Sequence, residues 1–193
     1  MARWPLCQTG PMTNEPPGIR CVAWSPDGSR VAGGTWEAEV LVWDPRTGEL
    51  LQELIHSDQP TVQQAGFMEV VEFSPDGGHL LSGHETGSLV IWDAAGNATL
   101  RLELPDFLAG AGWSLDGGHV WAVTHDDQLL LFDVATGART TLRRPQQFDL
   151  PDFQASAGWS LDGNHVWALT QDSQLLLFDA ATGARTTLRR SRP

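Results

Sequence analysis

Serine, aspartate and histidine recur together in this chain at a spacing that could serve hydrolytic chemistry. The pattern S-x-D-G-x-H occurs three times: Ser74, Asp76, His79; Ser114, Asp116, His119; and Ser160, Asp162, His165. A hydrolytic triad needs a nucleophile, a base and an orienting acid that converge on one pocket with an oxyanion site. A set that is repeated three times within a tight-turn sequence instead favours turn and strand-edge structure.

The sequence contains no motif for other catalytic chemistry or for cofactor binding. The histidines of these turns lack a second His or Cys at a metal-ligand spacing such as i, i+2 or i, i+4. The chain contains no G-x-G-x-x-G motif, no P-loop, and no lysine that could form a Schiff base or bind a phosphate. We therefore expect no cofactor, no metal and no enzymatic activity.

The charge balance restricts the class of partner. Asp and Glu number 24 against 12 basic residues, which gives a net charge of -12. Such a surface repels phosphates and anionic lipids, so neither nucleic acid nor a membrane is expected as a ligand. The chain has no run of about 18 apolar residues and no apolar leader. Because Cys7 and Cys21 are too few for a disulfide framework, we expect reduced thiols and a cytoplasmic location.

These residues are positioned by an internal repeat, which decides the fold. Four segments align without a gap, at 24–44, 73–93, 113–133 and 159–179. In each, an aromatic residue lies nineteen positions before an aromatic–Asp pair. The four sets are Trp24 with Trp43-Asp44, Phe73 with Trp92-Asp93, Trp113 with Phe132-Asp133, and Trp159 with Phe178-Asp179.

Each unit predicts four short antiparallel strands. Apolar runs alternate with turn sequences such as S-P-D-G and A-T-G, in which glycine can adopt positive φ. One such sheet cannot bury both of its apolar faces, so the sheets must stack on one another. Segments 111–144 and 157–190 differ at only five positions, which indicates a recent duplication or a constructed repeat.

The S-P-D-G turn, the terminal Trp-Asp pair and the four strands per unit resemble the WD40-repeat family over residues 18–190. The resemblance implies an all-β propeller with four blades per chain, arranged as a half-ring. Two features of the family are missing. The Gly-His position holds Gln64, Leu104 or Leu150, and Glu37 and Thr86 replace the turn aspartate that remains as Asp126 and Asp172. We therefore expect the hydrogen-bond network of the family to be incomplete.

The expected domain organisation is an N-terminal extension followed by the blades. Residues 1–17 form the extension, which could add an edge strand through Ala2 to Cys7. The blades are expected at 18–56, 67–104, 107–144 and 153–190. We expect most of the nine tryptophans to lie in the core, since Trp24, Trp43, Trp92, Trp113 and Trp159 hold repeat positions that pack blade on blade and Trp121 and Trp167 lie within a strand.

Recognition in a propeller is expected in its loops, which stand on a rigid support. By resemblance, the loops that join fourth to first strands and second to third strands gather on one face. Their exposed aromatic and acidic members are the candidate partner-binding residues: Trp36, Glu37, Phe67, Asp106, Phe107, Phe148, Asp152 and Phe153. An equal alternative is that Phe107 and Phe153 only fill the gap between blades.

These observations favour a non-catalytic scaffold that binds a protein or a basic peptide. A purely structural or constructed repeat protein is the alternative, and an enzyme with a loop-built site is a more distant one. Because a half-ring leaves two apolar blade faces open, we expect a second copy to close an eight-bladed ring as a homodimer. A fragment of a longer propeller, or assembly with the blades of another protein, would also cover those faces.

Overall fold

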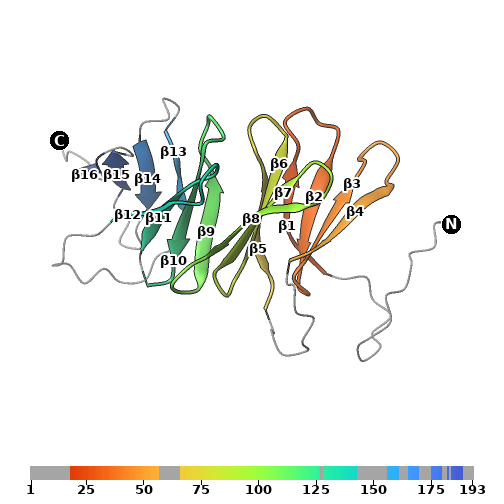
Figure 1. Cartoon of the computed structure of the whole chain (residues 1–193), viewed down its shortest axis with the longest axis horizontal. Coiled ribbons are helices and arrows are strands. Elements are labelled where there is room, and N and C mark those ends of the chain that lie inside the picture. The colour runs from red at the N-terminus through yellow and green to blue at the C-terminus, as the bar shows by residue number, and fades with distance from the viewer. Residues whose placement is uncertain are drawn as a thin grey trace, which may run out of the picture.

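The chain folds entirely into β-structure in the part that is described. The computed structural model describes residues 18–56, 66–126, 128–142, 156–160, 165–169, 175–179, 182 and 184–188. Within these ranges it contains sixteen strands and no helix, which confirms the all-β prediction. The strands form four antiparallel sheets of four strands each (Figure 1).

Each sheet corresponds to one repeat. The first contains β1 (Ile19–Trp24), β2 (Val31–Thr35), β3 (Glu39–Trp43) and β4 (Leu50–Ile55). The second contains β5 (Met68–Phe73), β6 (His79–His84), β7 (Ser88–Asp93) and β8 (Ala98–Glu103). The third contains β9 (Leu108–Trp113), β10 (His119–Thr124), β11 (Leu129–Asp133) and β12 (Arg139–Leu142). The fourth contains β13 (Ser156–Trp159), β14 (His165–Leu169), β15 (Leu175–Asp179) and β16 (Arg185–Leu188). Every strand pairs with the next one in sequence.

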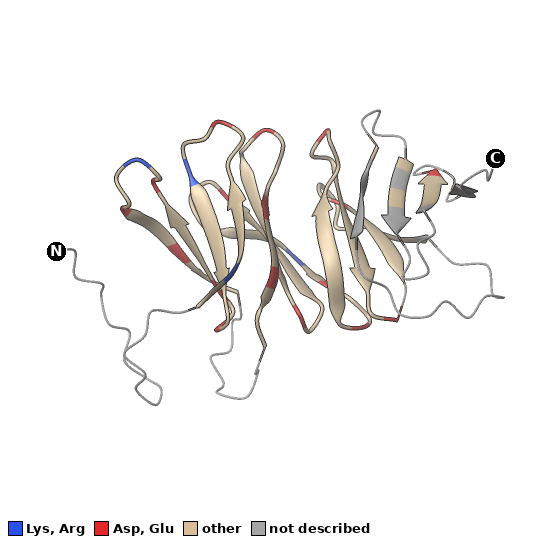
Figure 2. Cartoon of the chain, turned by 180° about the vertical axis from the view of Figure 1, so that it is seen from behind, with Lys and Arg blue, Asp and Glu red and all other residues tan. Residues whose placement is uncertain are grey.

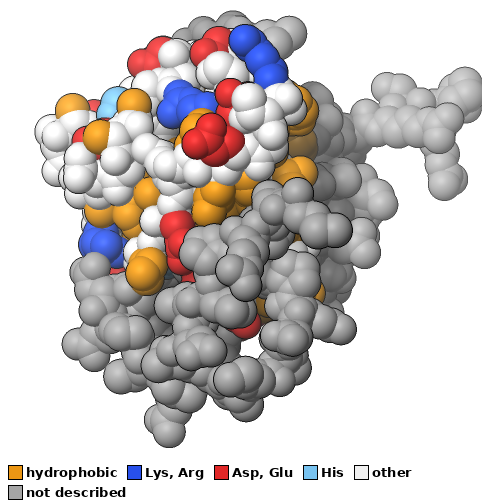
Figure 3. Space-filling model, turned by 90° about the vertical axis from the view of Figure 1, so that its right-hand side faces the viewer, with side chains coloured by type: hydrophobic (Ala, Val, Ile, Leu, Met, Phe, Trp, Pro, Cys, Tyr) orange, Lys and Arg blue, Asp and Glu red, His pale blue; other side chains and the backbone are white. Residues whose placement is uncertain are grey.

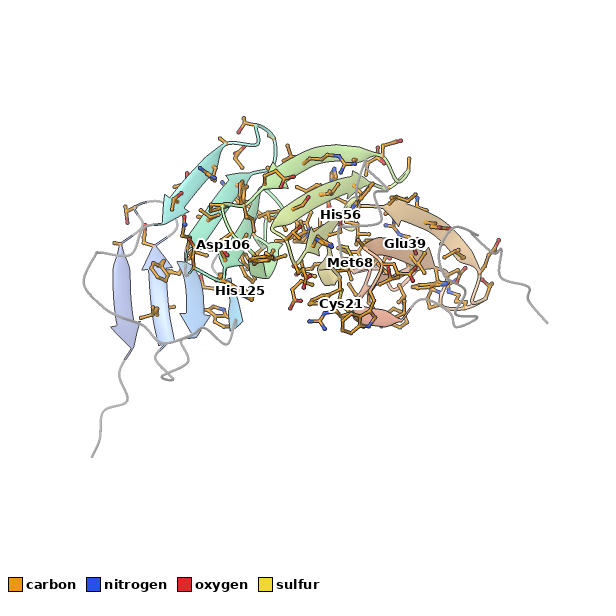
Figure 4. The ribbon with its side chains drawn as sticks, turned by 90° about the horizontal axis from the view of Figure 1, so that it is seen from below. Cys21, Glu39, His56, Met68, Asp106 and His125 are labelled. Carbon is orange, nitrogen blue, oxygen red and sulfur yellow. The ribbon has the colours of Figure 1, made fainter. Side chains whose placement is uncertain are left out.

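The sheets stand side by side along an open arc (Figure 4). The first strands of successive sheets, β1, β5, β9 and β13, contact one another, so they line the inner side of the arc. This is the arrangement of propeller blades around a channel, and the described residues do not close that channel.

The recurring Ser-Asp-His set builds turns, as the sequence predicts. Ser74 Oγ donates a hydrogen bond to Asp76 Oδ1 at 2.6 Å and accepts one from the amide of His79 at 2.9 Å. Gly77 in this turn has φ 71°, a conformation that glycine adopts without strain. The imidazole ring of His79 lies 6.3 Å from the ring of Trp113 in the next sheet. Each of the three groups thus has a structural contact.

Apolar side chains fill the spaces between successive sheets. One cluster of buried residues lies in each of the three spaces. The first, between the first and second sheets, includes Ala32, Val40, Val42, Phe73 and Trp92. The second, between the second and third sheets, includes Leu81, Leu89, Trp113 and Phe132, and the third, between the third and fourth sheets, includes Trp121, Leu131, Leu176 and Phe178. The strands supply these residues at alternate positions, because successive side chains of a strand point to opposite faces. Every sheet thus buries at least one face against its neighbour.

Hydrogen bonds between side chains link Ser82 and Trp92 of the second sheet to His56, which follows β4. This is a sheet in which the hydrogen-bond network of the WD40 family was expected to be incomplete. The indole nitrogen of Trp92 donates to Ser82 Oγ at 2.7 Å, and Ser82 Oγ lies 2.9 Å from Nδ1 of His56. Nε2 of His56 lies 3.1 Å from the carbonyl oxygen of Ser88, so this nitrogen carries the proton and Nδ1 accepts from Ser82. The repeat pattern predicts this histidine at the position of Gln64, but the imidazole comes from His56, eight residues earlier in the chain.

One tryptophan lacks the expected packing within a single copy of the chain. Trp113 and Phe73 are each 6% exposed, whereas Trp24, at the same position of the first repeat, is 62% exposed. Among the described residues, no sheet lies in front of the first one, so the predicted blade-on-blade contact of Trp24 is not formed there. Trp121 is buried, in agreement with its predicted place in the core. Its counterpart Trp167, in the last sheet, is half-buried.

Candidate partner-binding surface

The candidate residues of the first three sheets lie along one edge of the arc. In each of these sheets, the residue after the second strand hydrogen-bonds the residue before the first strand. The amides of Trp36, Glu85 and His125 donate to the carbonyl oxygens of Gly18, Phe67 and Phe107 at 3.1, 3.1 and 2.9 Å, respectively. This repeated contact places three equivalent residue pairs in a row near the inner side of the arc.

At the first and second sheets, two predicted aromatic residues contact each other. The rings of Trp36 and Phe67 are 5.0 Å apart at 66°, an edge-to-face arrangement. The guanidinium carbon of Arg20 lies 3.6 Å from the centre of the Phe67 ring and 4.9 Å from that of Trp36. Arg20 Nη2 also lies 3.0 Å from Glu69 Oε2. We call Arg20, Trp36, Phe67 and Glu69 the aromatic–arginine cluster.

The backbone explains why these four side chains meet. Arg20 is on β1 and Glu69 on β5, the adjacent inner strands of two sheets. Gly18 leaves room for the indole, because a Cβ at Gly18 would lie only 2.7 Å from Trp36 Cδ1. The cluster remains open to solvent: Trp36 is 53% exposed, and the Arg20 and Glu69 side chains are 31% and 29% exposed.

Carboxylates follow Trp36 along the chain. Glu37 follows Trp36 in the exposed turn, and Glu39 begins β3. Partial burial raises the pKa of Glu39, and the nearby charges of Glu53 and Glu37 raise it further. Acidic positions recur in turns at both edges of the arc (Figure 2). Carboxylates that raise the pKa of a neighbour show a concentration of negative charge, which attracts cations.

A second group of candidates lies at the third sheet. Phe107 is 55% exposed and its ring is 6.4 Å from that of His125, so it does not fill the gap between sheets. The carboxylate of Asp106 accepts a hydrogen bond from the Phe107 amide at 2.7 Å, which orients the segment that leads into β9. Asp106 and His125 lie toward the inner side of the arc (Figure 4).

The structure brings together only some of the predicted residues. Trp36 and Phe67 touch, Glu37 is adjacent to them, and Asp106 and Phe107 belong to the next gap between sheets. The other three candidates, Phe148, Asp152 and Phe153, lie outside the described residues. Arg20 and Glu69 were not among the partner-binding residues predicted from the sequence. A single charge at the second position of each apolar run, IRCVAW and MEVVEF, is the signal that could have identified both.

Other side chains at this edge serve the fold. The sulfur atom of Cys21, a free thiol, lies 3.6 Å from the Met68 carbonyl oxygen, and burial raises the pKa of this thiol.

In the described ranges, no three His, Cys, Asp or Glu side chains are grouped as they would be around a metal ion. The same ranges contain no helix with the length and hydrophobicity of a membrane span.

Two family models match the chain. The model described as "WD domain, G-beta repeat" matches residues 8–44, and the model described as "Outer membrane protein assembly factor BamB" matches residues 36–186. The shorter match agrees with the WD-type pattern of the first repeat. The longer match covers more than half of the chain, so the chain belongs to the repeat family that this second model describes. The outer-membrane assembly role in that description is said of the proteins that bear the name.

Solved structures support the same fold. The β-propeller domain of Cps50 (Swd1) from Myceliophthora thermophila superposes with a TM-score of 0.76 at 18% sequence identity. The match covers 92% of this chain but only 58% of that one. No curated protein matches the sequence. The similarity to the solved structure shows that the chain has the β-propeller fold.

Proposed function

We propose that this chain is a non-catalytic β-propeller scaffold that binds a protein or peptide partner, and that the partner supplies basic side chains to the contact. The aromatic–arginine cluster carries the proposal. Its two rings already hold the guanidinium of Arg20, and the carboxylate of Glu69 is within 3.0 Å of that group. A surface that holds one guanidinium in this way has the chemistry to hold another.

Physical chemistry favours a basic partner over other ligands. Aromatic faces attract cations, and an exposed contact of this kind contributes about 0.5–1 kcal/mol. Exposed tryptophan and phenylalanine also supply the large apolar contact area that dominates protein interfaces. The net charge of -12 adds a long-range attraction for basic peptides and opposes nucleic acid. Catalysis gains no support from the described residues, whose repeated Ser-Asp-His sets are used in turns.

We also propose that the scaffold acts as a homodimer that closes an eight-bladed ring. The supporting observation is that the arc of four sheets stays open, with an exposed apolar face on the first sheet (Figure 3). A purely structural or constructed repeat protein is the second candidate, and the near-identity of segments 111–144 and 157–190 favours it. Peptide binding separates the two candidates, since only the scaffold has a partner. A cytoplasmic location remains part of the proposal.

Fluorescence anisotropy with a labelled arginine-rich dodecapeptide tests the partner class. Trp36→Ala and Phe67→Ala are each expected to weaken binding at least fivefold, because each removes one ring of the pair. A glutamate-rich peptide of the same length should bind neither the wild type nor the variants.

The matched control is Leu115→Ala. Leu115 is an exposed apolar residue in the turn between β9 and β10, at the opposite edge of its sheet from the cluster. This variant should bind like the wild type. Equal binding by all four proteins, or no binding by any, would remove the aromatic–arginine cluster as the partner site.

A further inference from the structure

The outward face of the first sheet repeats one half of an interface that the chain uses elsewhere. Trp24, Val31, Leu41 and Trp43 hold the repeat positions of Phe73, Leu80, Val90 and Trp92 in the second sheet. Those four residues of the second sheet are buried against the first sheet. In the first sheet Leu41 is buried, but Trp43 is half-buried and Trp24 is 62% exposed, and the described residues place no sheet in front of them.

Two glycines, in the β1–β2 and β3–β4 turns at one edge of the first sheet, lack the neighbours that their counterparts have. A Cβ at Gly77 of the second sheet would lie 3.5 Å from Pro26 of the first, whereas nothing lies within 4 Å of the equivalent position at Gly28. A Cβ at Gly137 would lie 3.2 Å from Leu100 of the preceding sheet, whereas nothing lies within 4 Å at Gly48. The missing contacts extend from the inner to the outer strands, so a whole sheet is required to restore them.

The other half of the interface stands at the far end of the chain. In the third sheet, Trp121, Leu129 and Leu131 pack against Leu176 and Phe178 of the fourth. The fourth sheet repeats the first three of these positions as Trp167, Leu175 and Leu177, and Trp167 pairs in register with Leu177. Trp167 and Leu177 are only half-buried. The fourth sheet thus carries the sequence that binds a following sheet.

We propose that the outward face of the fourth sheet docks onto the outward face of the first sheet of a second copy. The two contacts are equivalent under a twofold axis and close the ring. This inference rests on the proposed homodimer and specifies which surfaces meet. The internal interfaces also supply expected contacts. Trp113 Nε1 donates to the carbonyl oxygen of Glu72 at 3.1 Å, and Trp24 would donate in the same way to Gly158, which holds the Glu72 position in the fourth repeat.

Chemical cross-linking tests the order of the sheets. Gln52 Nε2 of the first sheet donates to the Ala94 carbonyl oxygen of the second at 2.9 Å, and Thr186 and Pro45 are the counterparts of these residues across the proposed contact. In a chain with Cys7→Ser and Cys21→Ser, we would mix a Thr186→Cys copy with a tagged Pro45→Cys copy and add a short bis-maleimide. A covalent dimer of about twice 21.0 kDa is expected from the mixture and from neither variant alone.

Two controls keep the result interpretable. The pair Gln52→Cys with Ala94→Cys in one chain must cross-link internally, because that contact lies within the chain. Trp24→Asp should weaken self-association at least tenfold in light scattering while far-UV circular dichroism stays unchanged. Phe107→Asp, a change at an exposed aromatic residue away from this face, should leave self-association intact.

The outcomes separate this inference from the broader proposal. A dimer that cross-links through Pro45→Cys alone or through Thr186→Cys alone would overturn the end-to-end order while the homodimer stands. A wild-type chain that stays monomeric at all concentrations would overturn both the end-to-end order and the homodimer. Residues 1–17 or another protein would then be the expected cover of the first sheet. Peptide binding at the aromatic–arginine cluster is measured separately and is unaffected by either result.

Discussion

Nδ1 of His56 accepts a hydrogen bond from the hydroxyl of Ser82, 2.9 Å away, and this contact joins the segment after the first sheet to the middle of the second. Ser82 in turn accepts from the indole of Trp92, so the contact orients three buried side chains. The imidazole must be neutral to accept. Burial and the neighbouring His84 lower the pKa of His56 to about 4.

This pKa predicts a loss of stability in mild acid. An unfolded histidine binds a proton below about pH 6.5, whereas folded His56 resists protonation down to about pH 4. Between these values the unfolded state holds more protons, so the free energy of unfolding rises with pH, by up to about 3 kcal/mol for this residue. Urea melts from pH 4 to pH 7 measure the slope.

His56→Ala should remove this pH-dependent component and lower stability at pH 7, because Ser82 loses its acceptor. His125→Gln is the control, since His125 is exposed and its substitution should preserve the slope. A wild-type slope that survives in His56→Ala would assign the proton uptake to another group.

Trp113→Ala should destabilise the chain by roughly 3–5 kcal/mol, as expected for removing a large buried aromatic side chain. The indole packs between the second and third sheets and hydrogen-bonds Glu72 across that gap. Asp106→Ala should cost far less, because the carboxylate is partly exposed and bonds only an adjacent amide. Denaturant melts with equal midpoints for the two variants would contradict this division of core and loop. The same loss is predicted for Trp159→Ala, whose side chain lies outside the described residues.

Gly87→Ala should destabilise the chain more than Gly28→Ala. Both glycines have positive φ, 96° and 70°, so either alanine costs roughly 1–2 kcal/mol in backbone conformation. A Cβ at Gly87 would also lie 2.4 Å from the carbonyl oxygen of Asp106, whereas the space around Gly28 is open in one copy of the chain. Thermal melts of the two variants at low protein concentration compare these costs directly. Equal losses would mean that the segment at Asp106 yields readily.

Arg20→Ala should strengthen binding of the arginine-rich peptide about two- to fivefold, because it vacates the rings of Trp36 and Phe67 and frees the Glu69 carboxylate. Arg46→Ala makes the same change in net charge at an exposed turn and should have little effect. Weaker binding by Arg20→Ala would show that Arg20 supports the peptide site, and would contradict a site for which Arg20 competes with the peptide.

The sequence by itself determined the repeated sheets and their turns. An aromatic residue nineteen positions before an aromatic–Asp pair, with S-x-D-G between the first two strands, specifies strands and turns through local contacts. The hydrogen bonds of Ser74 with Asp76 and His79 span at most five residues. Local chemistry of this kind is written directly in the sequence, so the all-β fold and the structural role of the Ser-Asp-His sets could be predicted.

Only the tertiary structure decided the contacts between sheets. Arg20 and Glu69 meet because two inner strands lie side by side, although 49 residues separate them. His56 reaches Ser82 from a position that the repeat does not predict. Trp24 and Trp113 hold the same repeat position, yet one is exposed and the other buried, because burial depends on a neighbouring sheet. A repeat specifies the surface of each blade, whereas the position of a blade in the arc determines whether another sheet covers that surface.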